Sequence, residues 1–149
     1  MVQARIKGSR IMTARRIQLP TLPGEIIQDI VDNVDFIGNI YHWKDAPELT
    51  QQWCRDNICS DMYWGIQIIT GDLPAHKDIG TEVKFNYIIH SGGETVLTNF
   101  YDNSGNLIET INFVSNAWYI MNVSIEHSVV GVESTRVSLT GRIFPTHRV

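Results

Sequence analysis

Three residues with metal-binding side chains could share one ion. His76 and Asp78 lie two positions apart in the segment 74–78. In an extended segment, residues two apart point to the same face, so both side chains can reach one cation. His127 lies much further along the chain and is the candidate for a third ligand from another part of the fold. Two imidazoles and one carboxylate leave three coordination positions open, which suits iron(II), whereas a structural zinc site usually closes its fourth position with another residue.

Each of these residues also has an ordinary structural interpretation. His-x-Asp pairs arise by chance, and His76 could be a loop histidine beside a solvated aspartate. A lone histidine such as His127, on a strand with apolar and polar residues, is more often a hydrogen-bonded structural residue. Their joint placement in a β-rich part of the chain, and the strand that follows His127, favour the metal site.

That following strand carries a row of polar side chains. Period-two alternation over residues 135–142 puts Arg136, Ser138, Thr140 and Arg142 on one face. A guanidinium can bind a carboxylate through two hydrogen bonds, and a nearby hydroxyl can add a third. A dicarboxylic cosubstrate could thus chelate the metal at one end and be clamped by Arg136 and Ser138 at the other. The alternative is an antiparallel edge strand with its polar face in water.

The elements that must position these residues follow from hydrophobic periodicity and turn residues. We expect one domain over residues 1–149, with an extended lead-in at 1–24, a helical part at 25–60 and a β-barrel core at 62–144. Short strands at regular spacing indicate an antiparallel sandwich or barrel. Together with the preceding helices, they predict a mainly β fold of the double-stranded β-helix type, also called a jelly roll or cupin-like barrel. The expected helices are 25–35 and 47–58, and the expected strands are 62–70, 83–90, 95–101, 107–113, 118–130 with an interruption near Ser124, and 135–144.

Composition limits the function classes. Of the 149 residues, 43% are hydrophobic and 19% are charged, so a sizeable core is expected and general disorder is not. The net charge of -4 argues against a broad cationic surface for nucleic acid, although Arg5, Lys7 and Arg10 make the start of the chain basic. No apolar stretch approaches the length of about 20 residues that spans a membrane. Two cysteines without a CxxC motif are expected to be packing residues, so we expect a cytoplasmic protein.

The three groups of candidate residues together resemble the motif set of the iron(II)/2-oxoglutarate-dependent dioxygenases. The matching residues are His-Lys-Asp at 76–78, His-Ser-Val at 127–129 and Arg-x-Ser at 136–138. The segment 92–95 and the pair 100–101 are similar to prolyl-hydroxylase-like members, and 127–129 is similar to aspartyl/asparaginyl hydroxylase-like members. The resemblance covers roughly residues 72–144, and it does not select one subfamily.

This resemblance implies a role for each matching residue. His76, Asp78 and His127 would be the ligands of Fe(II), Arg136 would bind the far carboxylate of the cosubstrate 2-oxoglutarate, and Ser138 would assist. Asn86 would place a polar group against the cosubstrate, with Tyr87 and Tyr101 as further candidates. Arg142 is the alternative clamp if the strand register differs.

The resemblance also implies an enzyme that hydroxylates its substrate and converts 2-oxoglutarate to succinate and CO2. The substrate is expected to be a small molecule or a peptide. Because the chain is short, it has little material for a lid over the metal, so the substrate is large or a further subunit of a homo-oligomer closes the site. Two other functions stay open: a non-catalytic cupin-type module that binds a metal or small acid, and a structural jelly roll without a metal.

Overall fold

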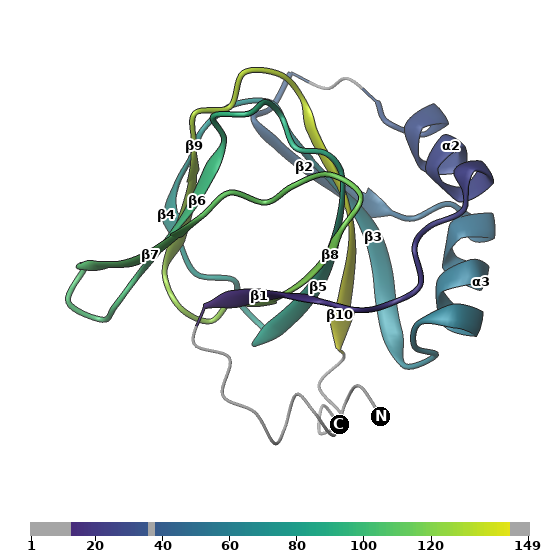
Figure 1. Ribbon diagram of the computed structural model, residues 1–149, viewed down its shortest axis with the longest axis horizontal. Coiled ribbons are helices and arrows are strands. Elements are labelled where there is room, and N and C mark those ends of the chain that lie inside the picture. The colour runs from purple at the N-terminus through teal and green to yellow at the C-terminus, as the bar shows by residue number, and fades with distance from the viewer. Residues whose placement is uncertain (1–12, 36–37, 144–149) are drawn as a thin grey trace.

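The computed structural model describes residues 13–35 and 38–143. Two antiparallel β-sheets face each other, and two helices pack outside one of them (Figure 1). The elements, in chain order, are β1 Ala14–Ile17, α2 Gly24–Asp32, β2 Tyr41–Asp45, α3 Glu48–Asn57, β3 Met62–Ile69, β4 Leu73–His76, β5 Val83–His90, β6 Leu97–Tyr101, β7 Leu107–Ile111, β8 Trp118–Asn122, β9 His127–Val130 and β10 Arg136–Ile143.

The larger sheet has the strand order β1-β8-β5-β10-β3-β2, and the smaller has the order β4-β9-β6-β7. All pairs of neighbouring strands are antiparallel. The chain crosses from the larger sheet to the smaller after β3, β5 and β8 and returns after β4, β7 and β9, as in a jelly roll. The prediction of a mainly β, double-stranded β-helix with N-terminal helices is therefore confirmed.

The outer face of the larger sheet is apolar and is covered by the helices. Ile26 and Ile30 of α2 and Cys54 of α3 pack in one cluster with strand residues such as Trp64 and Leu139. Each fully buried aliphatic side chain of this kind contributes about 1.5–3 kcal/mol of transfer free energy. Since the outer face supplies this core, the inner face of the same sheet can carry polar side chains.

Strand β10 lies between β5 and β3, at the centre of the larger sheet. The predicted alternation along it is present: Val137 and Leu139 belong to the apolar cluster, whereas Arg136 and Ser138 face the space between the sheets. The alternative interpretation of this segment, an edge strand with its polar face in water, is wrong.

Two short strands lie where the sequence predicts other structure. Strand β1 forms within the expected lead-in, and β2 interrupts the expected helical part at 25–60. Ala-Arg-Arg-Ile shows no apolar–polar alternation, and Tyr-His-Trp-Lys-Asp alternates over only four residues. Both are the outermost strands of the larger sheet, so pairing with β8 and β3 determines their conformation.

The segment 71–74 lies outside every predicted strand, yet it contains the beginning of β4. Pro74 hides this strand from sequence analysis, yet proline is tolerated on an edge strand, and β4 is the edge of the smaller sheet. The expected strand 118–130 is divided into β8 and β9, with the break at the predicted place near Ser124. The remaining strands and both helices agree with their predicted ranges to within a few residues.

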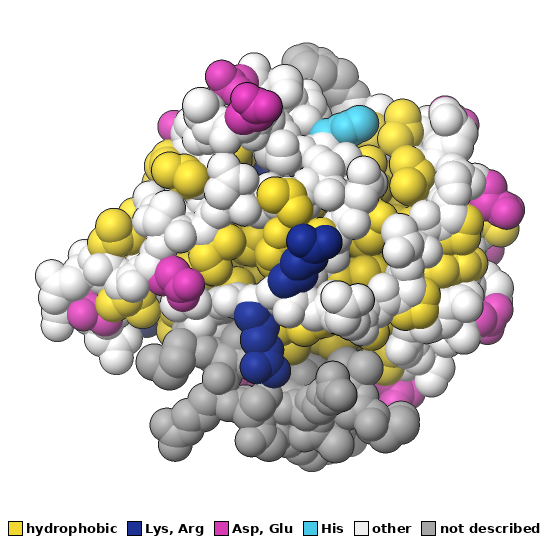
Figure 2. Space-filling model, in the orientation of Figure 1, with side chains coloured by type: hydrophobic (Ala, Val, Ile, Leu, Met, Phe, Trp, Pro, Cys, Tyr) yellow, Lys and Arg dark blue, Asp and Glu magenta, His cyan; other side chains and the backbone are white. Residues whose placement is uncertain are grey.

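The surface gives further information about the expected partners. On the face shown in Figure 2, Lys and Arg side chains are confined to a small area near the middle, among hydrophobic side chains. The described residues on this face therefore form no broad cationic patch. The basic residues Arg5, Lys7 and Arg10, and the end of the last predicted strand at Phe144, lie outside the described residues. No helix in the described part of the chain is long and apolar enough to cross a membrane.

Candidate metal centre

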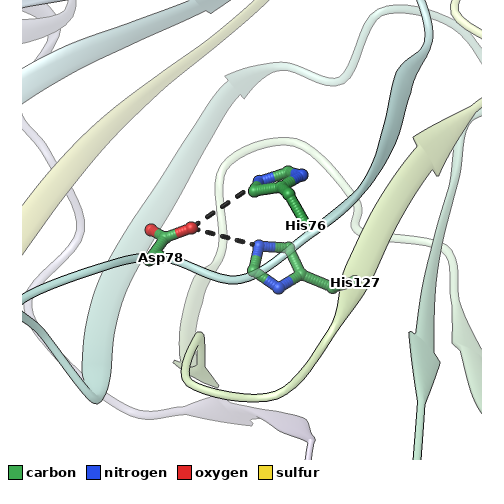
Figure 3. Close-up of side chains that lie close together, drawn as sticks. All are labelled: His76, Asp78 and His127. Carbon is green, nitrogen blue, oxygen red and sulfur yellow. Dashed lines mark ion pairs between the residues drawn. The ribbon is translucent and has the colours of Figure 1, made fainter.

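The three predicted ligands come together at the edge of the smaller sheet (Figure 3). His76 is the last residue of β4, and it pairs in register with His127, the first residue of β9. Their ring centroids are 4.4 Å apart. Asp78 follows β4, where its backbone N–H donates to the carbonyl of Val123. One ligand atom from each residue lies within 4.8 Å of the other two.

Both imidazoles are held by their Nδ1 atoms. His76 Nδ1 lies 2.8 Å from the carbonyl oxygen of Pro74, and His127 Nδ1 lies 2.8 Å from that of Ile125. Because a carbonyl can only accept, each Nδ1 carries a hydrogen, and each Nε2 of a neutral ring is left with a lone pair. Such hydrogen bonds fix the tautomer and the orientation of metal-binding histidines.

The free ring nitrogens converge on one carboxylate oxygen. The distances from Asp78 Oδ1 are 3.6 Å to His76 Nε2 and 3.4 Å to His127 Nε2. Three electron-pair donors that face one another need a cation among them, either a proton on an imidazole or a metal ion. The donor set of two imidazoles and a carboxylate, with no fourth protein ligand, fits a divalent metal with open positions, iron(II) included. Over residues 13–35 and 38–143, no other trio of His, Cys, Asp or Glu is arranged to hold a metal.

Asp78 has a second partner that the sequence interpretation missed. Lys84 on β5 places Nζ 2.5 Å from Asp78 Oδ2, and only 4% of the Lys84 side chain is exposed. Burial by itself would raise the pKa of Asp78, but the close approach of His127 and the ion pair with Lys84 outweigh burial and hold this pKa well below its usual value. The carboxyl group is thus ionised, as a metal ligand must be.

Lys84 could have been found by alternation. Asn86 was singled out on the same strand, and a residue two positions earlier in a strand shares its face. What the sequence does not contain is the information that this face is the interior of the barrel. There the pKa of Lys84 is lowered by burial, and Asp78 opposes that change.

A pocket runs between the sheets from His76 and His127 to Arg136. Its empty volume is about 440 Å³, counting the solvent at its mouth. Besides these residues, its lining includes the predicted cosubstrate residues Ser138 and Asn86. Ser138 Oγ donates to Gln67 Oε1 at 3.3 Å, and Asn86 Oδ1 accepts from Thr140 Oγ1 at 2.9 Å. The structure thus brings five of the six predicted site residues to the lining of one cavity, and the sixth, Asp78, lies beside His76 and His127.

Arg136 is a buried cation at the far end of this pocket. It is 5% exposed, and its guanidinium carbon lies 5.3 Å from the centroid of the Phe113 ring. No ion pair of the described residues includes it. Burial lowers the pKa of Arg136 to about 10. A buried charge without a counter-ion is unfavourable, so this end of the pocket is suited to an anion.

The other candidate residues do not line this pocket. Tyr87 lies on the outer face of β5, where its ring packs against Trp118 at a centroid distance of 5.1 Å. Tyr101 lies 2.9 Å from the hydroxyl of Ser128 and is outside the pocket lining. The expectation that either tyrosine contacts the cosubstrate is wrong, because alternation turns both side chains away from the cavity. Arg142, the alternative clamp, lies at the other end of β10 from Arg136.

Comparisons with known proteins support the fold. No protein-family model matches the sequence, and comparison with curated proteins finds no match. Among solved structures, a prolyl-4-hydroxylase from Pseudomonas putida is similar over 95% of this chain and 97% of its own, with a TM-score of 0.58 and 13% identity. A cupin superfamily protein from Desulfitobacterium hafniense is similar over 87% of this chain and 100% of its own, with a TM-score of 0.50 and 11% identity. The chain therefore has a cupin-like jelly-roll fold, in which the His-Asp-His cluster forms a candidate metal centre.

Proposed function

We propose that this protein is an iron(II)- and 2-oxoglutarate-dependent oxygenase that hydroxylates a small molecule or a peptide. One observation carries the proposal. The Nε2 atoms of two histidines and an oxygen of Asp78 meet at one end of an interior pocket, and Arg136, which is buried and has no carboxylate partner among the described residues, lies at the other end. The similarity of the fold to a prolyl-4-hydroxylase is consistent with this arrangement.

The ligands would hold the iron through atoms that the surrounding structure already orients. His76 and His127 would bind through Nε2, because their Nδ1 atoms are engaged by backbone carbonyls. Asp78 would bind through Oδ1, because Lys84 occupies Oδ2. When bound, iron(II) would supply the activation of dioxygen and the oxidation of the substrate, with 2-oxoglutarate converted to succinate and CO2.

Arg136 would bind the far carboxylate of 2-oxoglutarate. A guanidinium pairs with a carboxylate through two parallel hydrogen bonds, and this pair gains strength in a site with little water. Ser138 lies two residues away on the same face of β10, so its hydroxyl is placed to add a hydrogen bond. Asn86 lines the pocket, where its Oδ1 accepts from Thr140 and its Nδ2 lies 2.6 Å from the sulfur of Met121.

Uncoupled turnover tests the proposal without knowledge of the substrate. The protein is incubated with iron(II), ascorbate and 2-oxoglutarate in air, and succinate is measured by mass spectrometry. We expect slow succinate formation that is lost in Asp78→Ala and retained in the control His90→Ala, since His90 is an exposed histidine at the end of β5. Folded wild-type protein that binds metal and yet forms no succinate would instead be a binding module.

A further inference from the structure

A second cation on the inner face of β10 lacks a counter-ion. Arg142 is six positions beyond Arg136, so by alternation it shares the same face. It pairs in register with Lys84 of β5 and is half-buried. Its guanidinium carbon lies 5.1 Å from the centroid of the Trp43 ring. Its Nε atom is buried and has no hydrogen-bond acceptor among the described residues.

The charges of the barrel interior do not balance. Lys84 is neutralised by Asp78, but no ion pair of the described residues includes Arg136 or Arg142. Each of these arginines lies over one aromatic ring. A ring face stabilises a cation by about 0.5–2 kcal/mol, which does not replace a counter-ion when water is excluded. Two anions, rather than one, would neutralise the positive charges of Arg136 and Arg142.

The two arginines define separate anion positions. Six residues of strand correspond to about 20 Å between their Cα atoms at a rise of about 3.3 Å per residue. Arg142 lies at the end of β10 that pairs with Lys84, the partner of the metal ligand Asp78. Arg136 lies at the opposite end, beside Phe113. A cosubstrate clamped by Arg136 therefore leaves Arg142 without an anion.

Arg142 lies close to residues that line the metal pocket. Burial raises the pKa of Tyr41, and Gln67 and Arg142 beside its hydroxyl oppose that rise. Gln67 lines the pocket that also contains His76. Tyr41 is 37% exposed, so a solute can reach this cluster from solvent.

We propose that Arg142, with Trp43 and Tyr41 beside it, is the substrate-binding subsite of this oxygenase, and that the substrate carries an oxyanion group, a carboxylate or a phosphate. The proposal rests on the proposed function, because it assigns the first anion to 2-oxoglutarate. The guanidinium would hold the anionic end of the substrate and so direct the remainder towards the metal. Trp43 would keep the guanidinium plane in place and contact the apolar part of the substrate.

Nuclear magnetic resonance of the arginine side chains tests this subsite in the intact protein. The Nε–H signal of Arg142 is assigned by its absence from Arg142→Gln, and acetate and inorganic phosphate are the two probes. We expect at least one probe to shift this signal saturably, and the stronger probe to indicate the class of the substrate anion. The Nε–H signal of Arg55, a half-buried arginine already paired with Glu48, should not move. An Arg142 signal that neither probe shifts, or that moves only as much as that of Arg55, would overturn the proposal.

Two further measurements separate this proposal from the proposed function. Adding zinc and 2-oxoglutarate should move the Nε–H signal of Arg136 and leave that of Arg142 free to respond to acetate or phosphate. If Arg136 does not respond, the cosubstrate assignment fails while the test of Arg142 still stands. Arg142→Lys, which keeps the charge but loses the fork of donors, should weaken binding of the stronger probe by about tenfold, or about 1.4 kcal/mol. Unchanged affinity in this variant would contradict a bidentate site.

Discussion

The carboxylate of Asp78 is contacted from two sides. His127 lies at one oxygen and Lys84 at the other, and the ion pair with Lys84 is nearly shielded from solvent. Breaking a buried pair by removing one partner leaves an uncompensated charge, whereas an exposed pair contributes little. The energetic role of Lys84 can therefore be separated from any role in metal binding.

Replacing Lys84 with methionine is expected to lower the free energy of unfolding of the metal-free protein by about 3 kcal/mol, because Asp78 loses its buried partner. The matched control is Lys44→Met, which removes another Lys–Asp pair, at 2.7 Å from Asp35 but exposed. That variant should lose no more than about 1 kcal/mol. Urea denaturation measures the free energy of unfolding of both variants. Equal losses would show that the buried pair stabilises the fold no more than the exposed pair does.

Arg136 is expected to reduce the stability of the ligand-free protein. Burial lowers its pKa to about 10, and this shift corresponds to a cost of about 3 kcal/mol for the charged form. Arg136→Met should therefore raise the free energy of unfolding near neutral pH by up to about 3 kcal/mol. Since the folded-state pKa is the lower one, this cost is fully present below about pH 10 and shrinks only as the pH rises further. Urea denaturation at several pH values should show the advantage of the variant shrinking, and a less stable variant at neutral pH would contradict the assignment.

The ligands could be predicted from their types and spacing, since His76 and Asp78 lie two apart in an extended segment and His127 begins a strand. The importance of Lys84 and Arg142 could not be predicted in this way. A basic residue on a strand is usually solvated. Only the closure of two sheets around these side chains makes them buried or half-buried.

Among the elements, β2 has a packing requirement that the sequence does not reveal. Trp43 lies across β3 at Gly65, and a Cβ at position 65 would overlap the Trp43 ring. The Trp43 ring also contacts the ring of Tyr63, at a centroid distance of 5.2 Å, and the guanidinium of Arg142. Gly65 thus allows a tryptophan to approach the backbone of a central strand.

Gly65→Ala is expected to destabilise the fold by about 1–3 kcal/mol, because the added methyl group has no space. The control is Gly24→Ala at the first residue of α2, where a Cβ would meet nothing within 4 Å. Alanine there should be neutral or slightly stabilising, because it is the better helix former. Thermal unfolding followed by circular dichroism would give both values, and similar melting temperatures for the two variants would contradict this packing.

The elements that could be predicted are those whose own side chains are periodic. Strands β5 and β10 alternate between the apolar outer face and the polar interior, and their predicted ranges agree with the structure to within one residue. Strands β1, β2 and β4 are edge strands of only four or five residues, too short for a clear pattern, and their partners in the sheet determine their conformation. Their positions depend on contacts between distant segments, which no local pattern contains.

Over the whole molecule, the polar interior is possible because the two faces of the larger sheet differ in polarity. The helices and the outer face form the main apolar cluster, so the inner face can hold three cations and one carboxylate. A metal and anions bound there would stabilise the folded state, because the unfolded chain has no such site. We expect the interior to be least stable when empty.

Zinc and 2-oxoglutarate should therefore raise the melting temperature in two separate increments. Each ligand at about 100 times its dissociation constant stabilises the folded state by about 2.7 kcal/mol. Arg136→Met should keep the increment from zinc and lose most of that from 2-oxoglutarate, since it removes only the carboxylate partner. Differential scanning fluorimetry measures both increments, and a variant that retains the full effect of 2-oxoglutarate would show that the acid binds elsewhere.

The convergence of His76, Asp78 and His127 on one iron ion that also binds 2-oxoglutarate is tested most directly by anaerobic absorption spectroscopy. Iron(II) and 2-oxoglutarate added together to the wild-type protein should produce a weak visible metal-to-ligand charge-transfer band, and either one alone should not. The band should be lost in His127→Ala and retained in the control His90→Ala. A wild-type protein that shows no band, or a band that survives in His127→Ala, would contradict the metal centre described above.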